Sequence, residues 1–275
     1  MVTKIDYEAR AVHAARSVLL EITHLLGAYH DKIVLVGGWV PQLLLATKEN
    51  PHIGSTDIDL ALDHQKIGTN EYEMILELLK SKGYEQGEQP FIFFRKCTVA
   101  GQEIIVQIDF LAGEYEGTGK KHRHQKIQNI RARKARGCDL AFEHPIAIKM
   151  EGDLPNGGKD SVTVMVSAIV PFIIMKGMAL ADRMKEKDAW DIHYCLKYFP
   201  GGLDSLVNTF KPFLLHGLVK EGLKKIDEKF TSPAYIGPKS VADFEEITDD
   251  EERALLQREA FERVDALLKK LGVRS

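Results

Sequence analysis

Ile33-Val34-Leu35-Val36-Gly37-Gly38-Trp39 is the stretch that decides how this chain folds, and Ser55-Thr56-Asp57-Ile58-Asp59-Leu60 follows it after a spacer. The first run is apolar and ends in a glycine pair, which predicts a buried strand followed by a tight turn. The second run is apolar apart from two aspartates, which predicts another strand that carries both acids. The spacer, Trp39 to Thr56, is 18 residues long and has room for a short helix and a loop.

The two aspartates of the second run predict a metal site. Residues two apart on a strand point to the same face of a sheet, so Asp57 and Asp59 should lie roughly 6–7 Å apart there. Two negative charges at that distance repel each other unless a cation lies between them, and oxygen ligands favour Mg²⁺. The alternative is a solvated edge strand on which neither acid binds anything.

A third acid extends this prediction. Asp109 is the only acid in the apolar run 104–111, and neighbouring strands lie only about 4.8 Å apart. Asp109 is therefore a candidate third metal ligand beside Asp57 and Asp59, and three carboxylates around two Mg²⁺ ions are typical of phosphoryl transfer. The alternative for Asp109 alone is a structural role at the end of its strand.

The glycine pair favours phosphate binding over other nucleotide-binding modes. Gly37 and Gly38 let the backbone approach a phosphate closely and point its amides at it. The chain contains neither Gly-x-x-x-x-Gly-Lys-Ser/Thr nor Gly-x-Gly-x-x-Gly, so a P-loop enzyme or a dinucleotide enzyme is not expected.

Hydrophobic periodicity divides the chain into two halves and predicts an α+β fold. Helices are expected at 6–29, 40–46 and 69–82, and strands at 32–36, 57–62, 90–99, 102–111, 140–150 and 161–167. This organisation predicts an α/β domain at 1–167, with a mixed sheet flanked by helices, and a helical domain at 168–275. Within the second domain, 231–243 is expected to be a loop, and Thr248 with Glu251 is expected to form a capping box.

Composition excludes several classes of protein. The net charge is −3, so the surface as a whole is not expected to bind nucleic acid. Cys97, Cys138 and Cys195 follow no disulfide or zinc spacing, the first residues lack the apolar core of a signal peptide, and the apolar stretch 167–181 is too short and polar to span a membrane. We therefore expect a cytoplasmic protein that has no membrane partner.

The order glycine pair, Asp-x-Asp, later acid resembles the nucleotidyltransferase superfamily of DNA polymerase beta. Gly37-Gly38, Asp57-Ile58-Asp59 and Asp109 match the pattern of that superfamily, although the spacer is longer than in its compact form. The resemblance implies that Asp57, Asp59 and Asp109 are catalytic metal ligands for Mg²⁺, with an NTP as substrate and Gly37 and Gly38 at its phosphates.

The helical half resembles the AbiEii toxin-like nucleotidyltransferases more specifically. Lys176-Gly177-Met178-Ala179-Leu180 matches one motif of that group, and Lys187-Asp188-Ala189-Trp190-Asp191 matches another. By this resemblance, Lys176 and Lys187 contact the nucleotide, and Asp188 is catalytic as an orienting group or base. The alternative is structural, with Asp188 as a helix cap and Asp191 paired with Lys187 at the surface.

The acceptor of the nucleotide stays open at this stage. The resemblance implies a transfer to RNA or protein by the toxin of a toxin–antitoxin pair, with an antitoxin protein as partner. A basic stretch between Gly117 and Cys138, which contains no acid, is suited to bind an RNA acceptor. The alternative for this stretch is a solvated face or a mobile loop. The alternatives are an adenylyltransferase that modifies a small molecule, as antibiotic-modifying enzymes do, and a nucleotide-binding module without catalysis.

Overall fold

The structure is a computed structural model that describes residues 3–45, 47, 49–99, 101–113, 124–127 and 130–274. It divides into two compact units, which we describe separately. The sheet unit contains 7–43 and 54–168, and the helical unit contains 1–6, 44–53 and 169–275. The segment 44–53, which belongs to the long spacer, therefore groups with the helical unit, although the sequence places it between two strands of the sheet unit.

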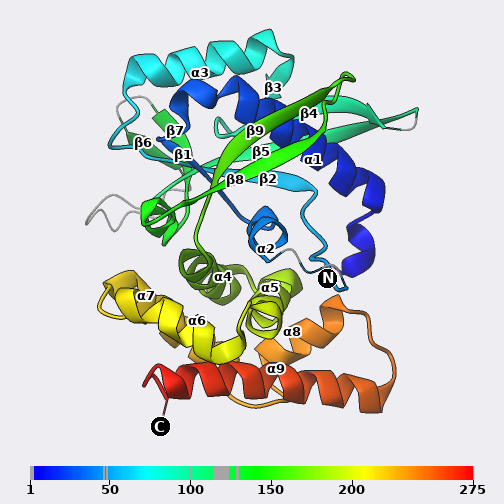
Figure 1. Cartoon of the computed structure of the whole chain (residues 1–275), viewed down its shortest axis with the longest axis vertical. Helices are drawn as coiled ribbons and strands as arrows, with labels where there is room; N and C mark the ends of the chain where they lie inside the picture. Colours follow the sequence, from blue (N-terminus) through cyan, green and yellow to red (C-terminus); the bar gives the residue numbers. More distant parts are fainter. Residues whose placement is uncertain are drawn as a thin grey trace. The chain divides into compact units, whose positions relative to one another are not determined.

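A mixed sheet forms the centre of the sheet unit (Figure 1). In the described part of the chain, the strand order is β3-β4-β5-β2-β1-β9-β8, with β7 paired to β5 and β6 to β7. The strands are β1 (Ile33–Val36), β2 (Asp57–Leu62), β3 (Tyr84–Gln86), β4 (Ile92–Val99), β5 (Gln102–Ala112), β6 (His124–Ile127), β7 (Ile130–Lys134), β8 (Ile146–Asp153) and β9 (Lys159–Val166). Parallel pairs (β2 with β5, β1 with β9) and antiparallel pairs (β1 with β2, β4 with β5) occur together, so the predicted mixed sheet is confirmed.

Helices pack on this sheet. They are α1 (Ala9–Leu25), α2 (Trp39–Leu44) and α3 (Thr69–Ser81), with a 3-10 helix at Cys138–Phe142. Ile22 and Leu26 of the α1 segment share a small cavity with Leu35 and Leu60, so α1 covers the sheet face to which Leu60 points. Because side chains alternate along β2, Asp57 and Asp59 point to the opposite face.

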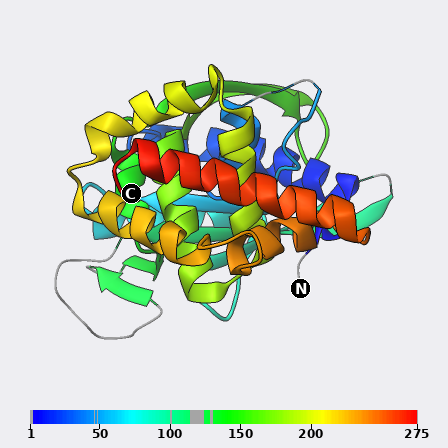
Figure 2. The same cartoon turned by 90° about the horizontal axis from the view of Figure 1, so that it is seen from below.

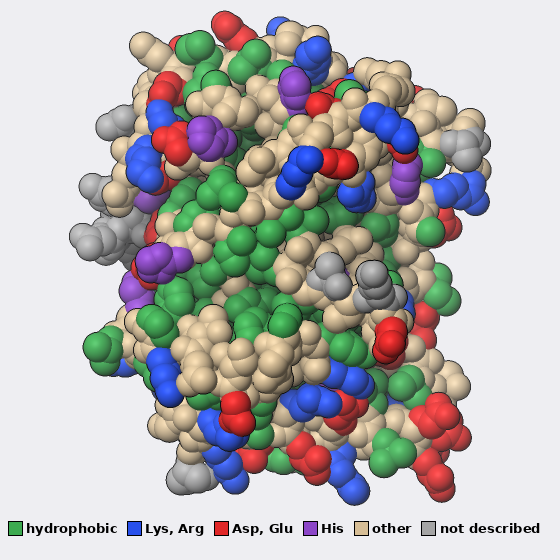
Figure 3. Space-filling model, in the orientation of Figure 1, with side chains coloured by type: hydrophobic (Ala, Val, Ile, Leu, Met, Phe, Trp, Pro, Cys, Tyr) green, Lys and Arg blue, Asp and Glu red, His purple; other side chains and the backbone are tan. Residues whose placement is uncertain are grey.

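The helical unit consists of short helices and one long one (Figure 2). They are α4 (Ile169–Arg183), α5 (Glu186–Tyr198), α6 (Gly202–Phe210), α7 (Gly217–Lys229), α8 (Ile236–Phe244) and α9 (Asp250–Lys270). α4 packs against α5 and α7, and α9 runs across α5, α6, α7 and α8. The surface at the lower end of Figure 3, over α9, mixes Lys and Arg with Asp and Glu, as expected for a solvated helix with pairs such as Arg263–Glu259. No described helix has the length and apolar character needed to span a membrane.

Three sequence expectations about secondary structure are wrong. The predicted strand 140–150 begins only at Ile146, because His144 has a left-handed backbone (φ 58°) ahead of Pro145. The predicted loop 231–243 contains α8, whose Pro238 lies in the first turn, where no backbone N–H is needed. The sequence also misplaces the start of α9: Asp249 Oδ1 accepts hydrogen bonds from the amides of Glu251 and Glu252, so Asp249, and not Thr248, is the N-cap.

Candidate active site

The sheet unit brings the three predicted metal ligands to one face. β2 and β5 are parallel, and their register sets Asp59 directly beside Asp109 and Asp57 directly beside Gln107. Neighbours in register point to the same side of a sheet. Asp57, Asp59, Asp109 and Gln107 therefore share the face opposite α1, and we call these four residues the acid face.

Uncharged donors contact the acid face. Ser55 Oγ donates to Asp57 Oδ1, and Gln107 Nε2 donates to Asp109 Oδ1 at 2.8 Å. The indole N–H of Trp39 donates to the backbone carbonyl of Asp57 at 2.8 Å, which ties the start of β2 to α2. Asp109 is only 4 % exposed, so the bond from Gln107 holds a buried carboxyl in position.

The glycine turn packs directly against the acid face. Gly37 has φ 71°, a left-handed conformation that side chains rarely adopt, and a Cβ at this position would lie 2.0 Å from Asp59 Oδ2. β1 ends here beside β2, with Val36 opposite Asp59, and Gly38 follows as a buried residue before α2. The close approach of the turn to Asp59 therefore requires glycine here, because the Asp59 carboxyl occupies the space that a side chain would need.

The chemistry of the acid face suits Mg²⁺, since it offers carboxylate oxygens on one surface. Among the described residues, however, no group of three or more His, Cys, Asp or Glu side chains is already arranged to hold a metal ion. The roles of Asp57, Asp59 and Asp109 as metal ligands stay predictions.

The remaining predicted site residues lie in the helical unit, where they form a buried ionic cluster. Its buried members are His52, Lys176, Lys187, Asp188 and Asp191, and Arg183, whose side chain is 40 % exposed, pairs with Asp188 at its edge. Lys176 Nζ lies 2.9 Å from Asp188 Oδ1 and 2.7 Å from Asp191 Oδ2. Lys187 Nζ lies 2.8 Å from Asp191 Oδ1. The two lysines are thus held by the two aspartates that follow them in the predicted motif.

Arg183 and His52 complete the cluster. The Nε of Arg183 donates to Asp188 Oδ2 at 2.8 Å, and the Nε2 of His52 lies 3.0 Å from Asp191 Oδ1. Asp188 therefore does not cap α5, whose N-cap is Lys185. Its carboxylate instead joins α4 to α5.

Burial and the neighbouring charges shift the pKa values in this cluster in opposite directions. The effect of the charges is the larger one for Asp188, Asp191 and Lys176. Burial alone raises the pKa of Asp191, but Lys176, Lys187 and His52 outweigh it, so the pKa is lowered overall. Burial likewise disfavours the charged form of Lys176, but Asp188 and Asp191 raise its pKa overall.

His52 is the exception, because burial has a larger effect on its pKa than the neighbouring Asp191 has. The pKa of His52 falls to about 4 despite its bond to Asp191, and the nearby Lys187 lowers it further. The imidazole is therefore neutral at neutral pH and serves Asp191 as a hydrogen-bond donor.

The structure thus separates the predicted site residues into two sets that belong to different units. Gly37, Gly38 and the acid face form one set, and Lys176, Lys187 and Asp188 belong to the other. The predicted alternative, in which Asp191 pairs with Lys187, is observed, but the pair is buried and not at the surface. Nucleotide binding by the lysines stays a prediction, and so does catalysis by Asp188.

Sequence reasoning missed three residues. Gln107 precedes Asp109 by two positions on the same predicted strand, so strand alternation would have placed it on the acid face. Ser55 lies just before β2, where alternation does not apply. No sequence pattern pointed to His52, because the loop around it has no hydrophobic periodicity. The basic stretch falls largely on residues 114–133, whose side chains lie outside the described part of the structure.

The chain is similar in structure to MenT4. MenT4 is a nucleotidyltransferase toxin from Mycobacterium tuberculosis H37Rv, and the similarity covers 100 % of both chains with a TM-score of 0.46 and 14 % sequence identity. No family model and no curated protein sequence matches the chain. At this identity and score, the similarity assigns no activity, and the function is inferred from the residues of this chain.

Proposed function

We propose that the protein is a magnesium-dependent nucleotidyltransferase, which moves NMP from an NTP to an RNA or protein acceptor. The observation that supports this proposal is the acid face, on which Asp57, Asp59 and Asp109 lie beside the glycine turn. In the reaction, a bond forms between the acceptor oxygen and the α-phosphorus, and the bond to pyrophosphate breaks.

The residues of the acid face are proposed to act as follows. Asp57, Asp59 and Asp109 would hold Mg²⁺, which supplies charge stabilisation for the triphosphate and the attacking oxygen. Gln107 positions the buried carboxyl of Asp109, and Ser55 positions that of Asp57. Gly37 lets the backbone of the turn lie directly against Asp59, and the amides of the turn would face a phosphate of the NTP.

The proposal gives the predicted nucleotide-binding lysines a different role. Lys176 and Lys187 are held by Asp188 and Asp191 in the buried ionic cluster. We propose that these four residues join α4 to α5 and maintain the fold of the helical unit. A direct role of Asp188 at the acceptor would require its bonds to Lys176 and Arg183 to open.

A transfer assay tests the enzyme assignment. The purified protein is incubated with each α-³²P-labelled NTP, with Mg²⁺ and a cell extract, and label is followed into RNA, protein and small molecules. Asp59→Asn should lower transfer about a thousandfold, roughly 4 kcal/mol of transition-state stabilisation. The matched control is Asp63→Asn, since Asp63 lies just after β2 and pairs with Lys66.

The outcomes of this assay separate the possible functions. Label in RNA or protein, lost in Asp59→Asn only, is the expected result. Label in small molecules would instead identify a small-molecule adenylyltransferase. Transfer that survives Asp59→Asn contradicts the catalytic assignment, and nucleotide binding without transfer to any fraction would indicate a non-catalytic module.

The toxin role is a further part of the proposal and rests on the resemblance to AbiEii-like toxins. Induced expression of the wild-type chain should arrest bacterial growth, whereas the Asp59→Asn variant at equal protein level should not. A neighbouring antitoxin gene product would relieve the arrest. Equal growth with both forms contradicts a toxic activity, while the transfer assay still tests the enzyme.

A further inference from the structure

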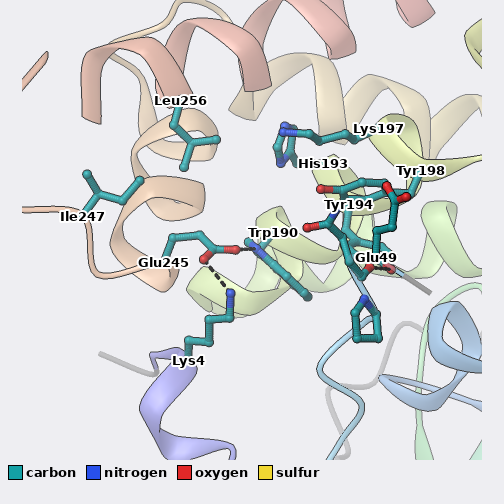
Figure 4. Close-up of a pocket in the computed structure, with 12 residues that line it drawn as sticks. Lys4, Glu49, Trp190, His193, Tyr194, Lys197, Tyr198, Glu245, Ile247 and Leu256 are labelled. Carbon is teal, nitrogen blue, oxygen red and sulfur yellow. Dashed lines mark hydrogen bonds and ion pairs between the residues drawn. The ribbon is translucent and has the colours of Figure 1, made fainter. Parts of the chain in front are cut away.

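The helical unit contains a cavity of about 430 Å³ (Figure 4). Its size falls within the range of small-molecule sites, about 300–1,000 Å³. Its walls come from α5, from the loop 49–51, from Lys4 near the N-terminus and from residues around the start of α9. All of these belong to the helical unit, and neither the acid face nor the buried ionic cluster lines the cavity.

A row of aromatic rings forms one wall of the cavity. Trp190, Tyr194 and Tyr198 are spaced four residues apart on α5, so they lie on one face of the helix. Their ring centroids lie 5.3 Å apart from Trp190 to Tyr194 and 4.7 Å apart from Tyr194 to Tyr198. Trp190 and Tyr194 are buried, with the His52 ring against both, so the partly buried Tyr198 is the ring of this row that a flat ligand can reach.

The polar ends of two rings are already engaged, which holds the wall rigid. The hydroxyl of Tyr194 donates to the backbone carbonyl of Asn50 at 2.7 Å, and the indole N–H of Trp190 donates to Glu245. These bonds fix the wall behind Tyr198, so little conformational entropy is lost there when a ligand binds.

The lysines that line the cavity do not favour a polyphosphate. Lys4 Nζ lies 2.8 Å from Glu245 Oε2, and Lys197 Nζ lies 3.1 Å from Glu259 Oε1. Glu49 also lines the cavity. Because acids balance these cations, the described walls suit an uncharged ligand better than a triphosphate.

His193 provides a hydrogen-bonding group at the cavity. Burial lowers its pKa to about 4, so the imidazole is neutral at neutral pH. Its Nε2 has no hydrogen-bond partner among the described residues, and Glu259 Oε1 lies 3.9 Å away. A buried polar atom of this kind normally has a partner, and a neutral imidazole nitrogen can either accept or donate.

From these contacts we propose that the cavity binds the uncharged, planar nitrogen heterocycle of a nucleoside. The ring would stack on Tyr198 at the accessible end of the row, and its polar edge would lie on the side of the cavity that His193 lines. This site goes beyond the proposed transfer reaction, because it needs neither a metal ion nor any residue of the acid face.

Tryptophan fluorescence tests the proposal directly. The chain has two tryptophans, so a Trp39→Phe variant leaves Trp190, in the cavity wall, as the reporter. Adenosine, cytidine, guanosine and uridine are titrated separately in EDTA, and inorganic tripolyphosphate serves as the anionic control. At least one nucleoside should quench the emission to saturation, and tripolyphosphate should not; calorimetry on the wild-type chain checks the affinity.

Cavity variants decide whether the nucleoside binds where we propose. Tyr198→Leu removes one stacking partner and should weaken binding about tenfold. Leu256→Phe reduces the cavity, and should also weaken binding, whereas Leu255→Phe on the neighbouring, 63 % exposed position should not. Thermal melts followed by circular dichroism check that each variant is folded. If Leu256→Phe does not fold, the affinity of Tyr198→Leu decides whether the nucleoside binds in the cavity.

Several results would overturn this proposal. They are no saturable binding of any nucleoside, unchanged affinity in Tyr198→Leu, or competition by tripolyphosphate. Asp57→Asn should bind the nucleoside as tightly as the wild type. A wild-type protein that binds a nucleoside but transfers no NMP would refute the proposed function alone. A wild-type protein that transfers NMP but binds no nucleoside in EDTA would refute the cavity proposal alone.

Discussion

The acid face and the buried ionic cluster both gather aspartates in apolar surroundings, but we propose different roles for them. In the cluster, Lys176, Arg183 and Lys187 surround Asp188 and Asp191, so the negative charge is matched within the fold. On the acid face, Ser55 donates a hydrogen bond to Asp57 and Gln107 donates one to Asp109. The aspartates of the cluster are thus committed to buried cations, whereas those of the acid face are the set that we propose for metal binding.

The largest expected effect on stability comes from the cluster. Asp191→Ala would leave Lys176 and Lys187 buried without this acid, and breaking a buried pair in this way costs about 3–5 kcal/mol. Urea denaturation should show this loss in the free energy of unfolding. A loss below about 1 kcal/mol, the value for a surface pair, would contradict the matched-charge description.

Magnesium should act on the acid face and not on the cluster. An ion that binds only the folded state at one hundred times its dissociation constant adds about 2.7 kcal/mol of stability. Titrating Mg²⁺ should therefore raise the thermal midpoint of the wild type and of Lys187→Met, but not that of Asp57→Asn. An equal rise in Asp57→Asn would place the ion elsewhere.

The cluster should also make stability depend on pH through His52. Its folded-state pKa, about 4, lies below its ordinary value of 6.5. The unfolded chain therefore binds the proton more readily, and the contribution of His52 is present above pH 6.5 and lost as the pH falls towards 4. Between pH 7.5 and 5, His52 should account for roughly 2 kcal/mol of lost stability.

His193 complicates this measurement, since its pKa is also lowered to about 4 by burial. Urea denaturation of the wild type, His52→Asn, His193→Asn and the double variant separates the two contributions. Each single variant should have a smaller pH dependence than the wild type, and the double variant the smallest. An unchanged pH dependence in His52→Asn would refute the neutral imidazole.

The smallest effect is expected from a surface pair in the same unit as the cluster. Asp204 pairs with Lys270 at 2.7 Å, but its side chain is 82 % exposed, so water and salt screen the interaction. Asp204→Asn should leave the thermal midpoint within experimental error. A clear drop in the thermal midpoint would show that burial is not what distinguishes the contribution of Asp191 to stability from that of an exposed pair.

Local signals predicted much of the sheet unit. β2 begins and ends at the predicted residues, Asp57 and Leu62, because an apolar run bounded by turn residues marks a strand clearly. The hairpin of β4 and β5 is confirmed as well, with Val99 opposite Gln102. The loop 231–243 was mispredicted because Gly237 and Pro238 usually break helices, whereas here both lie in the first turn of α8.

The sequence by itself determined which residues are acidic, which strands carry them and that Asp57 and Asp59 share a face, because alternation along a strand is a local property. Only the tertiary structure decided that Asp59 lies beside Asp109, since parallel register depends on how distant strands pair. Only the tertiary structure, too, placed His52 against Asp191 and showed that Lys176 and Lys187 lie in a buried ionic cluster. Burial and long-range pairing are set by the packing of the whole unit, and no short stretch of sequence encodes them alone.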